Sequence, residues 1–271
     1  MIEPVVVELA RPGAADLLGF FALQLGGGLT ASLGLLSPAQ VSHRFYRTQF
    51  LIALGLATLA TVFLWPSASG WVLALLLAGV VASFLGSLVW NLEGAPGGLA
   101  LIGVATALLL GALGLAEVQA GFTYSPLIVK LGLGWALADD FTSAAMVGAA
   151  TSAMLMGHSY LIAPAMSITP LMRLLGAMLV AVFLRAAVAA AALASIQPLW
   201  PYLETESWLW LGMRAAVGFG GVLVLSWMAW QAARIRSTQS ATGILYVAVI
   251  FCFIGELISA VLRARGGLVG L

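Results

Sequence analysis

Apolar residues in this chain are grouped in blocks of about 20, separated by short breaks rich in Pro and Gly. A helix rises 1.5 Å per residue, so about 20 residues cross the roughly 30 Å of bilayer hydrocarbon. The blocks predict eight transmembrane helices, at Leu17–Leu36, Phe50–Trp65, Trp71–Leu92, Gly98–Val118, Phe141–Ala163, Leu171–Ala194, Leu209–Ala232 and Ile244–Leu262. We therefore expect an all-α, polytopic transmembrane helical bundle with short loops, forming a single integral membrane domain over residues 1–271.

One stretch between spans four and five, Gln119–Asp140, does not fit this pattern. It is only moderately apolar and irregular, which predicts an interfacial or re-entrant segment. The adjacent acids Asp139 and Asp140 at its end are interpreted as the interfacial start of the fifth helix, where carboxylates favour the positive end of the helix dipole. The sequence shows neither a fixed-period repeat nor inverted halves.

The composition agrees with a membrane protein and excludes several classes of function. Charged residues make up 8% of the chain, against roughly 25% in soluble domains, and the net charge of +1 gives no field for nucleic acid. The single Cys252 excludes an internal disulfide and a thiolate metal cluster. Two histidines without clustered carboxylates argue against a metal site, and no hydrolase motif occurs. We assign no catalytic residue, and whether the chain takes part in an enzyme stays open; we expect at most a non-catalytic membrane subunit of an oxidoreductase complex.

The distribution of Lys and Arg gives an orientation. Eight spans place both termini on one face, and the opposite face carries slightly more basic residues. By the positive-inside rule, both termini are expected outside the cytoplasm, in a bacterial cytoplasmic membrane. The N-terminus lacks the basic region of a secretory signal, so the first span is expected to be retained.

Three charged residues lie away from the ends of their predicted spans: Arg185, Arg214 and Glu256. Charges within the hydrocarbon are costly and often functional, so these residues are candidates for a proton or substrate pathway. A structural ion pair between Glu256 and one or both arginines explains them equally well.

The two histidines form a second candidate site. His158 ends the fifth span and His43 precedes the second, so both are expected on the same membrane face at comparable depth. They could be paired axial ligands of a b-type haem. Alternatively, they could hydrogen-bond a quinone headgroup together with Arg44, Tyr46, Arg47, Tyr160 and Arg173. The simpler alternative is one loop histidine and one hydrogen-bonded core histidine.

These features favour an integral membrane subunit of a respiratory or other electron-transfer complex, which interacts with quinone or holds haem and requires partner subunits. The alternatives are a proton-coupled transporter or channel for an ion or small solute, and a structural or assembly subunit. In architecture alone, the eight spans and short loops resemble the quinone-reactive anchors of the polysulfide-reductase type, with no motif shared.

Overall fold

The computed structural model describes residues 13–92, 94–124, 133–163, 166–203 and 205–266. Within these residues, eight helical spans are long and apolar enough to cross a membrane, which confirms the predicted number. The chain is thus a membrane-spanning helical bundle. Its elements are α1 (Ala14–Leu33), α2 (His43–Leu64), α3 (Gly70–Val89), α4 (Gly98–Tyr124), α6 (Leu133–Ile162), α7 (Thr169–Ser195), the short 3₁₀ helix η1 (Gln197–Tyr202), α8 (Thr205–Met213), the π-helical η2 (Arg214–Gly221), α9 (Val222–Arg234) and α10 (Thr238–Gly266).

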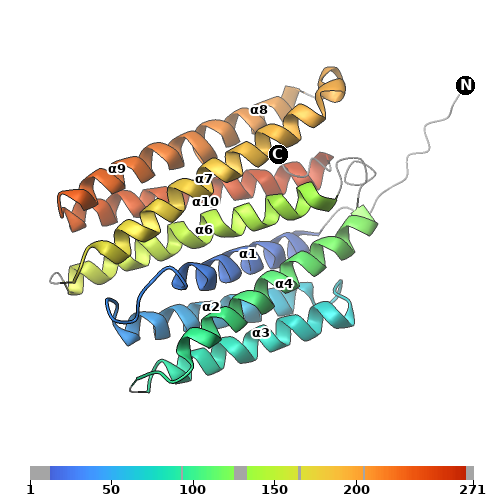
Figure 1. Cartoon of the computed structure of the whole chain (residues 1–271). Coiled ribbons are helices and arrows are strands. Elements are labelled where there is room, and N and C mark those ends of the chain that lie inside the picture. Colours follow the sequence, from blue (N-terminus) through green and yellow to red (C-terminus); the bar gives the residue numbers. More distant parts are fainter. Residues whose placement is uncertain (1–12, 93, 125–132, 164–165, 204, 267–271) are drawn as a thin grey trace, which may run out of the picture.

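The helices form two four-helix bundles that lie side by side (Figure 1). In the first bundle, α1, α2, α3 and α4 pack in a ring in chain order. In the second, α6, α7, the span made of α8, η2 and α9, and α10 do the same. Helix α1 begins and α10 ends at one end of the molecule, which we call the terminal end. The two bundles therefore follow the same path in the same direction, a similarity of architecture that the sequence did not reveal.

The two bundles meet along α1 and α6, which run parallel. A Cβ atom built on Gly28 would lie 1.8 Å from the carbonyl oxygen of Ala144, and one on Gly148 would lie 2.0 Å from the carbonyl carbon of Gly28. One turn further on, the hydroxyls of Ser32 and Ser152 are hydrogen-bonded at 2.5 Å. The two helices thus touch through a small-xxx-small pattern in each, which permits close backbone approach in lipid.

The structure corrects the interpretation of the Asp139–Asp140 pair. Helix α6 begins at Leu133, so both aspartates lie well inside it, and they are 1% and 0% exposed. They are not at an interfacial helix start. Much of the irregular stretch simply continues the flanking helices, with α4 reaching Tyr124. The remainder of the predicted interfacial or re-entrant segment, residues 125–132, lies outside the described residues.

The seventh span is not a uniform α-helix, because η2 interrupts it with a wider π-helical turn. The glycines here allow α10 to come close. A Cβ on Gly218 would lie 2.9 Å from Cα of Gly255, and one on Gly221 would lie 2.5 Å from the ring of Phe251. These contacts place the middle and the end of η2 beside α10 at Gly255 and Phe251.

Candidate functional site: a buried charge network beside a pocket

Arg185 on α7 is the inner hub of a network of buried charges. Its side chain is fully buried. The guanidinium donates from Nε to Oε1 of Glu256 and from Nη2 to Oε2, both at 3.3 Å, and Nη1 contacts Oδ1 of Asp139. The sequence-predicted pair of Arg185 and Glu256 is therefore brought together, and Asp139 joins it. A bidentate pair of this kind gives both buried charges a partner.

Arg263 on α10 is the outer hub. Its Nη1 lies 2.9 Å from Oε2 of Glu117, and its Nη2 lies 3.1 Å from Oδ1 of Asp140 and 3.4 Å from Oδ2 of Asp139. The amide of Gln24 donates to Oδ1 of Asp140 at 2.9 Å. Asp139 thus contacts both arginines and links the two hubs into one chain of charges.

This network crosses the boundary between the bundles. Gln24 and Glu117 come from the first bundle, through α1 and α4, whereas the aspartates and the arginines come from the second. Arg263 lies seven residues beyond Glu256 on α10, which is about 10 Å along a helix and toward the terminal end. The charged chain therefore runs from the interior of the membrane region toward that end.

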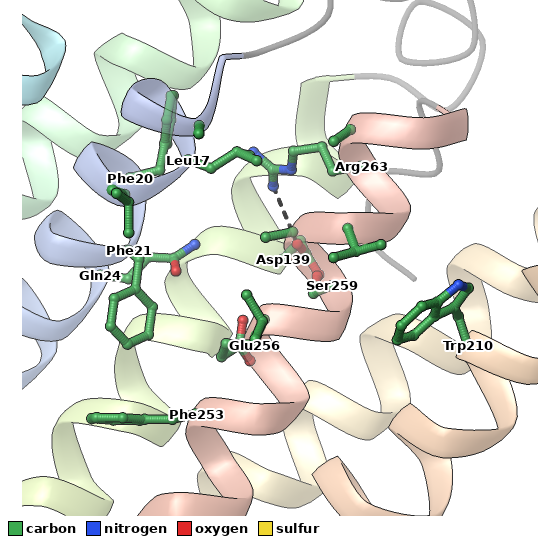
Figure 2. Close-up of a pocket in the computed structure, with 16 residues that line it drawn as sticks. Leu17, Phe20, Phe21, Gln24, Asp139, Trp210, Phe253, Glu256, Ser259 and Arg263 are labelled. Carbon is green, nitrogen blue, oxygen red and sulfur yellow. Dashed lines mark hydrogen bonds and ion pairs between the residues drawn. The ribbon is translucent and has the colours of Figure 1, made fainter.

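A pocket of about 700 Å³ lies against the network, between α1, α8 and α10. Figure 2 shows Phe20, Phe21, Phe253 and Trp210 around it, with Glu256, Asp139, Arg263 and Gln24 at its polar side. Two further lining residues, Leu18 and Leu257, are 51% and 65% exposed, so the pocket is open to the membrane-facing surface. An apolar cavity with a few convergent polar groups is the usual form of a small-molecule site.

Arg214, the third embedded charge predicted from sequence, has a different environment. It is 2% exposed, and its three side-chain nitrogens have no hydrogen-bond acceptor among the described residues. Its guanidinium lies over the ring of Phe219, whose centroid is 5.2 Å from the guanidinium carbon. Arg214 does not line the pocket, although it lies within electrostatic range of Glu256.

The histidines and the residues grouped with them are distributed around the opposite end of the bundle. His43 meets Trp90 edge-on at 5.5 Å, and Trp90 stacks on Tyr46 at 4.1 Å. His158 is exposed and faces the hydroxyl of Tyr246 at 3.5 Å.

The polar residues predicted to accompany the histidines also have separate contacts. Tyr160 is buried and donates to the carbonyl of Ser167, and the exposed Arg173 donates to the carbonyl of Leu35 at 3.4 Å. Arg44 and Arg47 are exposed. Within the described chain, no hydrogen bond or ring contact joins the two histidines. Haem ligation by this pair stays a prediction to which the geometry adds no support.

Sequence reasoning missed Gln24 and the four charged residues Glu117, Asp139, Asp140 and Arg263. The four charged residues lie at the ends of apolar blocks, where charges are usually solvated. The sequence matches no protein-family model, and comparisons with curated proteins and with solved structures find no significant match. The functional argument therefore depends on the chemistry of the site itself.

Proposed function

We propose that the chain is a quinone-reactive subunit of a membrane electron-transfer complex, and that the headgroup binds in the pocket between α1, α8 and α10. The observation that carries this proposal is an aromatic pocket, open to the bilayer, that ends at buried carboxylates and a guanidinium. This site differs from the histidine cluster that the sequence favoured.

The pocket's chemistry fits a quinone. A quinone is a lipophilic molecule with two carbonyl acceptors, and reduction to the quinol consumes two electrons and two protons. Arg263 and Gln24 can donate hydrogen bonds to a carbonyl, while the aromatic walls contact the ring. Glu256 and Asp139 line the same pocket and can deliver or accept the protons. A partner subunit with a redox centre would supply or accept the electrons.

The charge network gives the protons a route. Arg185 holds Glu256 and Asp139 close together, and Arg263 holds Asp139 close to Glu117 and Asp140. The guanidinium groups keep their own protons, so the transfer steps are between carboxylates. In this proposal the carboxylates exchange protons along the network, and the pocket communicates with the terminal end of the bundle. If both termini lie outside the cytoplasm, as the charge distribution predicts, that exchange is with the non-cytoplasmic side.

Binding can be measured with purified protein in nanodiscs. Decylubiquinone and menadione, titrated separately, should quench tryptophan fluorescence in a saturable way. Trp210→Phe should remove much of the quenching because Trp210 lines the pocket. The matched control is Trp71→Phe, since Trp71 is 79% exposed on α3 and is not among the lining residues. Solvent extraction of the protein purified in detergent should also release bound quinone.

Two outcomes would refute the proposal: no quinone in the extract together with no saturable quenching, or equal quenching in both tryptophan variants. The continuous network favours a second candidate, a proton-coupled transporter. In proteoliposomes, proton flux without added quinone that is lost in Glu256→Gln would support the transporter. A wild type with neither quinone binding nor proton flux, together with loss of folding in Glu256→Gln, would favour a purely structural network.

A further inference from the structure

Arg214 is a buried cation without a partner in the described part of the chain. Its guanidinium is 2% exposed, and none of its three nitrogens donates a hydrogen bond. Burying a charged group without hydrogen bonds costs several kcal/mol, so such groups in proteins usually have a specific role. The contact with the ring of Phe219 offsets only part of that cost.

The position of Arg214 places it next to Glu256. Arg214 opens the π-helical segment η2, a conformation that occurs frequently at functional sites. Its Cγ lies 3.6 Å from the Cβ position of Gly218, which itself lies against Gly255 of α10. Glu256 is the next residue on α10. The aliphatic part of the Arg214 side chain therefore lies beside the contact between Gly218 and Gly255, one residue from Glu256.

Among the described residues, the carboxylates in this region are unevenly distributed over its three arginines. Arg263 contacts three carboxylates and Arg185 contacts two, whereas Arg214 has none. If Glu256 left Arg185, that arginine would keep Asp139. Each of the three guanidinium groups would then have at least one carboxylate.

We propose that Glu256 exchanges Arg185 for Arg214 when the pocket binds its ligand. This step rests on the proposed quinone function. Glu256 lines the pocket and Arg214 does not, so the exchange withdraws a negative charge from the polar side of the pocket. A headgroup that accepts electrons gains negative charge of its own, and the withdrawal stabilises it there. Arg214 acts as a positioning residue through Glu256.

The exchange is tested first without ligand, by thermal unfolding of Arg214→Met, Arg185→Met and the double variant in detergent. In the wild type, Arg214→Met should leave the Tm unchanged or raise it, because it removes an unpartnered charge. In the Arg185→Met background, Glu256 should move to Arg214. The same Arg214→Met change should then lower the Tm by roughly 10 °C, since it leaves Glu256 without a cation.

Equal Tm shifts in the two backgrounds would overturn the exchange. The matched control is Arg234→Met, an exposed arginine at the opposite end of the bundle, whose shift should be the same in both backgrounds. If Arg185→Met does not fold, Arg185→Lys loses the bidentate fork and gives the same comparison with a smaller difference.

The second measurement concerns the ligand. If the exchange follows binding, Arg214→Met should weaken decylubiquinone binding by at least roughly fivefold while the ligand-free Tm does not fall. Unchanged affinity would overturn the coupling to the ligand. A wild-type protein that binds no quinone refutes the proposed function, whereas the ligand-free comparison still decides whether Glu256 changes partner.

Discussion

The replacement Arg263→Gln tests the outer hub directly. Arg263 contacts Glu117, Asp139 and Asp140, and its side chain is 15% exposed. Without it, Glu117 and Asp140 lose the one guanidinium that contacts them among the described residues, and Asp139 keeps Arg185. Removing one partner of a buried ion pair costs about 3–5 kcal/mol. At about 2–4 °C per kcal/mol for a chain of this size, the Tm should fall by roughly 6–20 °C.

The dependence on pH separates this electrostatic account from simple loss of packing. In the wild type, acid protonates carboxylates that are paired with Arg263, so it removes favourable interactions. In Arg263→Gln, protonation instead removes the unpaired charges. The difference in Tm between the two proteins should therefore shrink as the pH falls from about 8 to about 5. The assay is thermal unfolding in detergent followed by intrinsic fluorescence.

Two control variants accompany this test: the same replacement at an exposed arginine, and a conservative replacement at Arg263 itself. Arg234→Gln, at an exposed position at the opposite end, should change stability by no more than about 0.5 kcal/mol. Arg263→Lys keeps the charge but not the fork that reaches three carboxylates, so its Tm should be intermediate. A deficit in Arg263→Gln that is the same at every pH, or no deficit at all, would refute the reasoning.

Two further comparisons test the network and the junction between the bundles. Asp139→Asn should lower the Tm more than Asp140→Asn, because Asp139 contacts two guanidinium groups and Asp140 contacts one; the reverse order would mean that Asp139 is not the link between the hubs. Gly148→Leu should prevent assembly into a monodisperse protein on size-exclusion chromatography, because its side chain would meet the backbone of Gly28, whereas Gly55→Ala, with nothing within 4 Å, should elute as the wild type does. Normal elution of Gly148→Leu would show that the close contact of α1 and α6 is not needed.

Hydropathy was enough to predict the number of spans, because each crossing needs an apolar block of nearly constant length. The same criterion fails for the site. Asp139 and Asp140 interrupt an apolar pattern, so hydropathy alone starts the fifth span just after them. Helix α6 in fact begins about two turns earlier, at Leu133. Their charges are tolerated there because Arg263 and Arg185 come from other helices to meet them. Long-range partners of this kind have no local signal.

The embedded charges were found because Arg185, Arg214 and Glu256 lie within apolar blocks, and the structure pairs two of them. The difference between Arg185 and Arg214 could not be foreseen, since it depends on which carboxylates of other helices each guanidinium reaches. For the histidines, the sequence predicted the end of the bundle where they lie but not their contacts. His43 and His158 do lie toward the same end of the bundle, as the span count requires, but their rings contact Trp90 and Tyr246 instead of each other.

The pocket depends on the parallel paths of α1 and α6 and on the different residues that these two helices carry at matching positions. Along α1 and α6 the contacts join residues 120 positions apart, Ser32 with Ser152 and Gly28 with Gly148. With the same offset of 120 residues, the position on α1 that corresponds to Asp140 is Phe20, which lines the pocket. The second bundle thus supplies an acid where the first supplies a ring. Because the two helices share one path, the wall and the charges lie at the same depth, and a molecule from the bilayer can contact both at once.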